Sequence, residues 1–407
     1  MKYNSFVVSV VLILLVGCVE TPNQPPMYYE GDDTSLVPIF SIECLQDKRT
    51  VGNNVPIYEY GSTLMVRAVN IHDGTHCFAG VSLDEKKVKW YLPNPHPDHS
   101  WINQGYLHDN LFVVMSKNSD VNKGDTALYC FDLDTQTIVW SKDSWQSLAM
   151  WRGVVGYNDY CYHFEVPQDE DCVRLIKTHI LTGESTILYE NTTGSVFPNG
   201  GLKLASIGGT LYLIFCMWDL EKDSSRESTM ILNVYDVTNN KLTYQNHLPA
   251  VEQVGVVVTE PKGEVIYINQ GRTMYCFDFV KGEIVWSNNL DYEITHQVVV
   301  LDNGNILRLA QGELSYVNGT SGDVIWESRY HKDLDLLPMW VAVHDNYAYI
   351  HMSVYQIDVR DLNRNGKLAG VVRYEKAQFE ASIPAYMDSD GFLVLTQKEI
   401  LKYPYLD

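Results

Sequence analysis

Hydrophobic and polar positions alternate along most of the chain after residue 36, which is the pattern of half-buried β-strands. Clear period-two stretches are Val265–Ile268, Ile306–Leu309 and Tyr347–His351. Short turns rich in Asp, Asn and Gly separate such stretches, and no amphipathic helix pattern follows residue 40. The pattern therefore predicts an all-β chain of antiparallel strands joined by tight turns.

A longer phrase returns along the chain: an alternating strand, a polar turn, and a second strand that ends in Trp. Three clear copies read LYCFDLDTQTIVW at 128–140, MYCFDFVKGEIVW at 274–286 and LSYVNGTSGDVIW at 314–326. Weaker copies end at Ile187, at Tyr244 and near Gly370. Successive ends are about 40–57 residues apart, which is the length of a four-stranded propeller blade and not of a helical repeat. The clear Trp ends are Trp90, Trp140, Trp286 and Trp326.

The two ends of the repeat region complement each other. The C-terminal stretch supplies strands at Phe392–Thr396 and Ile400–Tyr403 with no Trp strand after them, whereas Pro38–Glu43 reads as a Trp-type strand with nothing before it. Joining them makes one blade from both chain ends, and this closure removes the exposed edges of an open array. We therefore predict a closed β-propeller over residues 37–407, with eight blades favoured and seven as the alternative.

The first residues form a separate element. Lys2 precedes an apolar run, Phe6–Val16, which is too short to span a bilayer, and the run ends in Leu15-Val16-Gly17-Cys18. This ending resembles a bacterial lipobox, which implies a signal peptide over residues 1–17 and a lipidated Cys18. Residues 18–36, rich in Pro, Gly and Asp, would be a flexible tether. The alternative is an ordinary secretory signal with an incidental Cys.

The repeat carries a family resemblance. The Asp278, Gly282 and Trp286 spacing, with looser forms at Asp132–Trp140 and Asn318–Trp326, resembles the PQQ-like β-propeller repeat. With a lipobox in front, the chain looks like the propeller lipoproteins of the outer-membrane assembly (BamB) type. The resemblance implies that the repeat tryptophans wedge between neighbouring blades as structural residues. Val19 after Cys18 further implies an outer-membrane location, with the leaflet undetermined.

The net charge of the chain limits the classes of partner that it can bind. The chain carries a formal net charge of −21, and removal of Lys2 with the signal leaves 29 basic against 51 acidic residues, or −22. Such a field repels nucleic acid, and no basic cluster offsets it. We therefore expect no nucleic-acid partner and a soluble, monomeric propeller held at the membrane by its lipid.

Seven cysteines remain after Cys18, so they cannot all pair within one chain. Cys130 and Cys276 occupy the same strand position in two repeats, which suits a small buried hydrophobe. Cys161 and Cys172 flank a predicted hairpin, so a cross-strand disulfide between them is left open.

Quinoprotein dehydrogenases share this repeat, so an enzymatic role is one alternative. Such enzymes hold their quinone with an adjacent-Cys disulfide, a Trp floor and a calcium site, whereas this chain has no adjacent Cys pair and no assembled acidic calcium set. Motifs of serine hydrolases, zinc proteases and P-loop proteins are also missing from the sequence. We therefore expect a protein without a cofactor and without catalytic residues.

Three sets of residues are candidate ligand sites. Asp361, Asn363 and Asn365 match the first half of an oxygen-ligand calcium loop, although Val372 stands where the bidentate Glu should be. The alternative for this segment is an expanded turn. His96-Pro-Asp98-His99, with His72 and His76 in the previous repeat, could bind a divalent metal or form a surface turn. Trp101, Trp151 and Trp340 are predicted on or near innermost strands, where they would line the channel and stack on a ligand, or pack in the core.

These observations favour a non-enzymatic, lipid-tethered scaffold that docks proteins in the cell envelope, with outer-membrane protein assembly as one concrete version. A glycan- or small-ligand-binding surface lipoprotein is the alternative, and a quinone-dependent dehydrogenase is the least favoured. Propellers bind through loops at one end of the ring, so partner specificity is expected there and not in the repeat itself.

Overall fold

A computed structural model describes residues 40–405 apart from several segments. The undescribed segments inside this range are 44–47, 51–57, 71, 119–124, 147–152, 168–169, 171, 194–195, 220–226, 253–255, 290–294, 311–312, 330–337, 353–355, 374–383, 388–389 and 396–398. The predicted signal, the tether, Cys18, Cys44 and Trp151 lie outside the described residues. Within the described part, no helix is long and apolar enough to cross a membrane.

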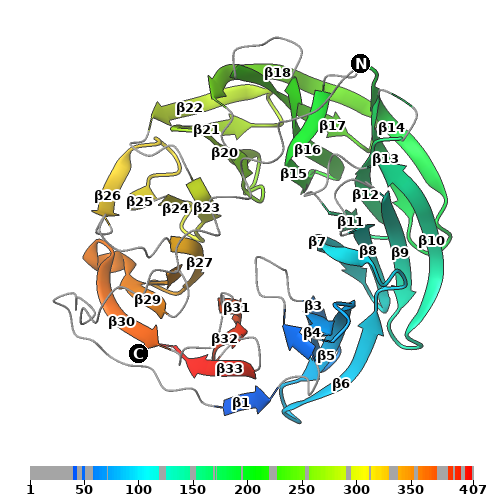
Figure 1. The fold of residues 1–407 in the computed structure, drawn as a ribbon. Helices are drawn as coiled ribbons and strands as arrows, with labels where there is room; N and C mark the ends of the chain where they lie inside the picture. The colour runs from blue at the N-terminus through cyan, green and yellow to red at the C-terminus, as the bar shows by residue number, and fades with distance from the viewer. Residues whose placement is uncertain are drawn as a thin grey trace, which may run out of the picture.

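The described strands form eight antiparallel sheets arranged as blades round a ring (Figure 1). The predicted all-β propeller of four-stranded blades is therefore confirmed, and the sheets number eight in the described chain. Blade 1 contains β2 (Lys48–Thr50), β3 (Tyr58–Tyr60), β4 (Thr63–Asn70), β5 (His76–Ser82) and β6 (Lys87–Pro93), with both β2 and β3 pairing with β4. Blades 2 to 7 are each a simple meander in which chain neighbours pair.

The meander blades follow one another in chain order. Blade 2 is β7 (His99–His108), β8 (Leu111–Asn118), β9 (Asp125–Asp132) and β10 (Thr137–Gln146); blade 3 is β11 (Val155–Tyr157), β12 (Tyr160–Glu165), β13 (Val173–His179) and β14 (Ser185–Asn191). Blade 4 is β15 (Val196–Ile207), β16 (Thr210–Asp219), β17 (Glu227–Asp236) and β18 (Lys241–Glu252); blade 5 is β19 (Val256–Val258), β20 (Val265–Gln270), β21 (Thr273–Asp278) and β22 (Glu283–Asn289). Blade 6 is β23 (Thr295–Val300), β24 (Ile306–Ala310), β25 (Glu313–Val317) and β26 (Val324–Arg329); blade 7 is β27 (Pro338–His344), β28 (Tyr347–Met352), β29 (Gln356–Asp361) and β30 (Lys367–Arg373), with a short 3₁₀ turn η2 (Leu362–Arg364).

Blade 8 is built from both ends of the chain. It contains β31 (Pro384–Met387), β32 (Gly391–Leu395) and β33 (Glu399–Pro404), and its outer strand is β1 (Phe40–Glu43). Phe40 pairs with Lys402 and Glu43 pairs with Glu399, so the strands run antiparallel beside each other (Figure 1). The predicted closure is therefore confirmed, and it leaves no blade unpaired at the junction.

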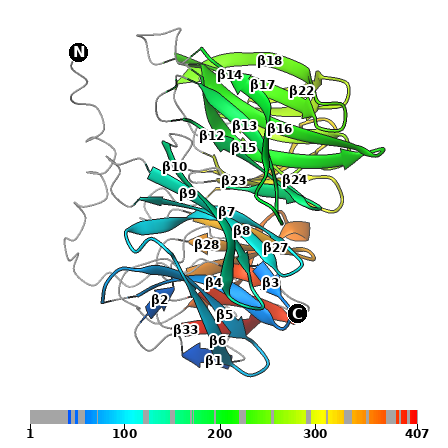
Figure 2. The ribbon, with the colours of Figure 1, turned by 90° about the vertical axis from the view of Figure 1, so that its right-hand side faces the viewer.

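A four-stranded meander has two distinct ends. Its first-to-second and third-to-fourth connections lie at one end of every blade, which we call the turn face. Its second-to-third connections and the links to the next blade lie at the opposite end, which we call the loop face. Figure 2 shows the ring from the side, with the blades spanning between these two faces.

A β-bulge recurs in the outer strand of blades 1 to 7. In blade 2 the register shifts between Ile138 and Trp140, so that Val139 has no partner on β9. The same single-residue shift precedes Trp90, Trp286 and Trp326. A bulge turns the next side chain out of simple alternation, so Trp140, Trp286 and Trp326 can face the following blade although each follows an Ile-Val or Val-Ile pair.

The aromatic side chain after the bulge packs on a turn of the next blade. A Cβ built on Gly322 would lie 2.6 Å from Cε3 of Trp286, and one on Gly366 would lie 2.7 Å from Cζ3 of Trp326. Both glycines have positive φ, 78° and 69°. The Trp286 indole N–H also donates to the carbonyl of Gly319 at 3.0 Å. In these repeats an aromatic ring that lies on a glycine turn of the next blade joins the two blades.

Of the weaker copies, the one in blade 4 makes the same contact, whereas the one in blade 7 shares only the bulge. Tyr244 lies on Gly282 of blade 5, where an added Cβ would approach its ring to 2.5 Å, and Gly370 takes the equivalent pairing position in blade 7. In blade 3, however, the bulge falls between Ile187 and Tyr189, so the repeat ends at Tyr189 and not at Ile187. The prediction for this copy was wrong by two residues because Ile187 precedes the bulge, where its side chain is 50% exposed.

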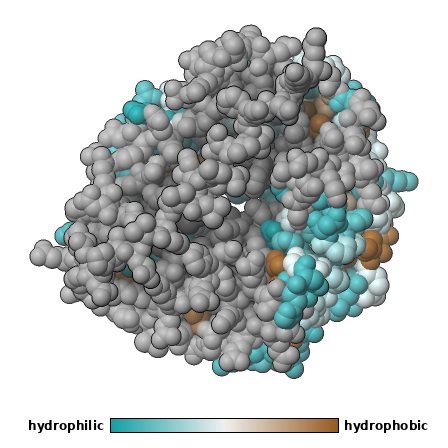
Figure 3. Space-filling view, in the orientation of Figure 1, coloured by the Kyte–Doolittle hydropathy of each residue, from teal (hydrophilic) through white to brown (hydrophobic). Residues whose placement is uncertain are grey.

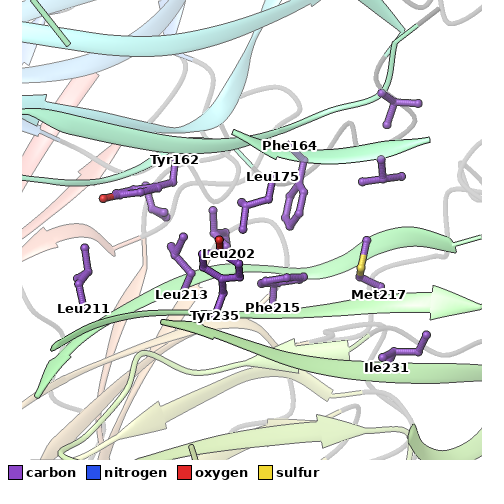
Figure 4. Close-up of a cluster of buried hydrophobic side chains, with 13 residues drawn as sticks. Tyr162, Phe164, Leu175, Leu202, Leu211, Leu213, Phe215, Met217, Ile231 and Tyr235 are labelled. Carbon is purple, nitrogen blue, oxygen red and sulfur yellow. The ribbon is translucent and has the colours of Figure 1, made fainter. Parts of the chain in front are cut away.

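Hydrophobic clusters fill the spaces between blades. Figure 4 shows one in which Tyr162, Phe164 and Leu175 of blade 3 interdigitate with Leu213 and Phe215 of blade 4. Phe164 and Phe215 meet edge to face with centroids 5.4 Å apart. Full burial of one such side chain contributes roughly 1.5–3 kcal/mol, so these interfaces stabilise the ring far more than the exposed outer strands do.

Charged side chains are also buried within the blades. The alternating pattern of the sequence does not predict them. Arg308 of blade 6 is fully buried, and its Nε donates to Asn269 of blade 5 at 3.0 Å. Glu313 is equally buried, 3.9 Å from Arg308. In blade 7, Arg360 pairs with Asp358 at 3.2 Å and donates to the carbonyl of Gly366. Removing one partner of such a pair would leave a buried charge uncompensated.

The glycine joint can be tested with one matched pair of variants. Gly322→Ala should destabilise the fold by about 1–2 kcal/mol for its left-handed backbone, plus about 1–3 kcal/mol for the clash with Trp286. Gly208→Ala, whose φ is 57° but which has nothing within 4 Å of its added Cβ, should lose the backbone contribution alone. Denaturant unfolding would measure the free energy of unfolding of both variants. Equal losses of free energy would contradict a close contact between Trp286 and Gly322.

Two buried histidines should make the fold sensitive to mild acid. Burial lowers the pKa of His163 to about 3, with Lys142 adding to the shift, and burial lowers the pKa of His351 to about 4. Because these folded-state values lie below the unfolded value of about 6.5, the neutral forms favour the fold above pH 6.5. Stability should fall by about 1.4 kcal/mol per pH unit for each histidine as the pH drops from 6.5 towards 4.

Urea unfolding at a series of pH values would measure this slope. The double variant His163→Asn with His351→Asn should start less stable but show a shallower decline between pH 6.5 and 4. An unchanged slope in the double variant would mean that other groups cause the acid sensitivity.

Candidate functional site

Exposed apolar side chains gather at the turn face. Among the described residues, nine large hydrophobic side chains are exposed, and each lies on or within three residues of a turn at this end of its blade. They are Ile138, Val139, Tyr157, Leu181, Ile187, Val280, Ile284, Val285 and Ile325. Scattered exposed residues are ordinary in soluble proteins, but their restriction to one end of the blades marks that end as a candidate contact surface.

The bulge explains why these residues are exposed. Val139, Val285 and Ile325 are the unpaired bulge residues of blades 2, 5 and 6, and they are 42%, 51% and 49% exposed. We call Val280, Ile284, Val285 and Ile325 the blade 5/6 apolar group. Since Trp286 seats on Gly322, the turns that carry this group belong to two blades in direct contact.

The turn face also carries a polar cavity of about 540 Å³ between blades 6 and 7. Asp302, Asn303, Asp345 and Asn363 line it together with Tyr316. The Tyr316 hydroxyl accepts from Asn303 at 2.9 Å, and its ring stacks on Trp326 with centroids 5.3 Å apart. The hydrophobic pattern does not predict this cavity, because its walls come from turns of two separate repeats.

The predicted calcium residues form the turn after β29. The Asp361 carboxylate accepts from the backbone N–H of Asn363 at 2.9 Å, and Asn365 ends the 3₁₀ turn with φ 56°. The carboxylate of Asp278 and the side chain of Asn318 accept from the corresponding turn amides of blades 5 and 6. This repetition favours the expanded-turn alternative for Asp361, Asn363 and Asn365, and calcium binding there stays a prediction.

The predicted channel tryptophans have different surroundings. Trp101 and Trp340 do lie on the innermost strands β7 and β27, while Trp151 lies outside the described residues. Trp101 is only 2% exposed and packs on Phe78, with Tyr129 and Phe131 edge-on, which is the core-packing alternative. Trp340 is half-buried. Figure 3 shows an opening at the centre of the ring, with mostly hydrophilic described atoms beside it.

The histidine motif forms a compact cluster on the loop face. Ligand atoms of His96, Asp98 and His99 all lie within 4.8 Å of one another. His72 and His76 do not join this cluster among the described residues. A second group in the described chain, Glu170, Cys172 and Glu190, is similarly close. There, however, Arg174 pairs with both carboxylates, so a cation already occupies the site.

The six described cysteines are buried. Cys130 and Cys276 are 0% and 2% exposed, which confirms their predicted role as small core residues. Burial raises the pKa of the Cys130 thiol to about 12 and that of Cys276 to about 11, so neither is an activated nucleophile. Cys161 and Cys172 form no disulfide, and the Cys172 thiol instead donates to Glu170 at 3.6 Å.

Comparisons with known proteins agree with this architecture. A family model described as "Outer membrane protein assembly factor BamB" matches residues 232–377, whereas no curated protein sequence matches the chain. BamB from Moraxella catarrhalis has a similar structure, with a TM-score of 0.57 at 10% identity, over 91% of this chain and 98% of that chain. The C-terminal WD40 domain of Sif2 gives 0.61 at 10% identity, over 93% and 100%, and Saccharomyces cerevisiae Sqt1 gives 0.59 at 8% identity, over 92% and 100%.

These structural likenesses show the fold alone, because WD40 and BamB propellers share it at similarly low identity. The family model adds sequence information over blades 4 to 7, where the repeat turns and tryptophans lie. The chain is a β-propeller, and the resemblance to the PQQ-like repeat of BamB-type proteins is confirmed over residues 232–377.

Proposed function

We propose that the protein is a lipid-anchored, non-enzymatic propeller that docks other proteins in the bacterial cell envelope. Its concrete role would be as an accessory in outer-membrane protein assembly. The observation that carries this proposal is the blade 5/6 apolar group on the turn face. All four of its residues fall within residues 232–377, the part that matches the BamB family model.

Physical chemistry favours a protein partner for this surface. The four side chains are 39–51% exposed, so each has apolar area that a partner could remove from water. Ile284, Val285 and Ile325 lie on the outer strands β22 and β26 and Val280 lies in the turn before β22, and the outer strand of a sheet can pair with an added strand. A glycan would instead need aromatic platforms with polar neighbours, and of the predicted tryptophans only Trp340 is described as partly exposed.

The absence of catalysis is part of the proposal. The buried, high-pKa thiols of Cys130, Cys161 and Cys276 favour packing over chemistry. Carboxylates of the repeat turns accept from turn amides, as Asp132 does from the N–H of Thr135. Enzymes of the quinone class would need a cofactor floor and calcium ligands that the sequence does not supply together.

Site-specific crosslinking would test the docking surface. A photo-crosslinking amino acid at Val285, in cells that express the full chain, should capture a component of the outer-membrane assembly machinery, identified by mass spectrometry. The same amino acid at Asn289, which is exposed on the loop-face end of β22, is the matched control and should capture it at least tenfold less. Val285→Asp should weaken binding of the purified partner about tenfold or more without lowering the melting temperature, because the side chain is half exposed.

Equal crosslinking from Val285 and Asn289 would contradict a turn-face docking site. Retention of a glycan with no protein captured from either position would favour the ligand-binding alternative.

The lipid anchor needs a separate test. Metabolic labelling with an alkyne-bearing palmitate should label the wild-type chain, and Cys18→Ser should abolish both the label and recovery in the outer-membrane fraction. Loss of the acyl chains removes about 0.8 kcal/mol of membrane binding for each buried methylene. Cys44→Ser is the control and should keep both the palmitate label and recovery in the outer-membrane fraction. Labelling that persists in Cys18→Ser would place the lipid elsewhere.

A further inference from the structure

We propose that His96, Asp98 and His99 form a binding site for a divalent transition-metal ion of the zinc class on the loop face. The site lies on the link between blades 1 and 2, at the opposite end of the ring from the apolar docking surface. It is therefore independent of the proposed scaffold function.

The three side chains supply a suitable donor set at nearly the right spacing. Two imidazole nitrogens and one carboxylate oxygen favour zinc, cobalt, nickel or copper over calcium and magnesium, which prefer oxygen ligands. Their ligand atoms lie within 4.8 Å of one another. Tetrahedral zinc with bonds of about 2.0–2.1 Å needs separations of roughly 3.3 Å. Rotation of half-buried His96 and exposed Asp98 towards buried His99 would close this gap.

The backbone of the site is held in place by Asn94. This residue is 4% exposed, and its side-chain oxygen accepts from the N–H of His96 at 3.1 Å. Its side-chain nitrogen donates to the carbonyl of His99 at 3.1 Å. The N–H of His99 in turn donates to the carbonyl of His96 at 3.0 Å. One buried amide thus fixes both ends of the segment that carries the three ligands.

Residues of the neighbouring strand β8 orient the ligands themselves. Ser116 contacts Nδ1 of His99 at 3.1 Å, and Asn118 donates to the Asp98 carboxylate at 3.3 Å. A proton on Nδ1 directed at Ser116 leaves the lone pair of Nε2 for a metal, and such outer contacts are what fix the tautomer of ligating histidines. The His96 and His99 rings already stack with centroids 4.6 Å apart.

The negative charge of the chain and the exposure of Asp98 also favour metal binding at this site. The chain carries a formal charge of −21, which raises the local concentration of cations. With three protein ligands, zinc keeps a fourth position for water or for a donor from a partner. Exposed Asp98 places that position on the solvent side of the loop face.

Calorimetric titration of the purified full chain with zinc would test the site. The wild type should bind one equivalent tightly, with an accompanying rise in melting temperature, and excess Ca²⁺ or Mg²⁺ should not compete. His96→Gln and Asp98→Asn should each weaken zinc binding by tenfold or more, while their melting temperatures without metal stay close to wild type. Cobalt should give the visible absorption of a low-coordinate nitrogen site in the wild type and lose it in both variants.

Two further variants make the result decisive. Glu190→Gln alters the Arg174-paired cluster and should leave zinc affinity unchanged. Asn94→Ala keeps all three ligands but frees their backbone, so it should weaken zinc binding with a smaller effect on the cobalt spectrum. The proposal would be overturned if the wild type bound zinc no more tightly than a double variant with His96→Gln and Asp98→Asn. A loss of zinc affinity in Glu190→Gln would also overturn it.

Discussion

The ring depends on one repeated interaction, in which an aromatic side chain of an outer strand rests on a left-handed turn of the next blade. Trp286 on Gly322 and Trp326 on Gly366 are its clearest examples. The bulge before each aromatic directs its ring to the neighbouring blade, and the missing Cβ of the glycine lets the ring approach closely. Because a single blade cannot bury its own apolar faces, these joints couple the stability of each repeat to that of its neighbours.

The same joint creates the surface available for partners. A bulge that turns the aromatic inward leaves the preceding residue unpaired, and in blades 2, 5 and 6 that residue is Val139, Val285 or Ile325. The exposed apolar positions therefore follow from the way the blades are joined, at one face of the ring. The fold and the proposed docking surface therefore have the same structural origin.

The two faces of the propeller differ in chemistry. The turn face combines apolar bulge residues with a polar cavity, whereas the described part of the loop face holds the His96, Asp98 and His99 cluster. An apolar contact surface at one end and a nitrogen-rich metal site at the other would let one molecule bind two chemically different partners at once. The buried Arg308 and Glu313 pair lies on β24 and β25 towards the loop face, inside the blade and away from its surface.

The repeat, its antiparallel strands and the closure of the ring could be predicted from the amino-acid pattern, because alternation and recurrent turns are local features of the chain. The pattern also pointed to the His96–His99 segment, whose side chains are neighbours in the chain. The predicted end of the blade 3 repeat at Ile187 was wrong, since a bulge changes which residue faces inward without changing the residue types. The packing of Trp101 in the core, the contact of Arg308 with Asn269 of another blade and the cavity between blades 6 and 7 became visible only in the folded molecule. Each of these depends on contacts between residues far apart in the chain, which a hydrophobic pattern does not record.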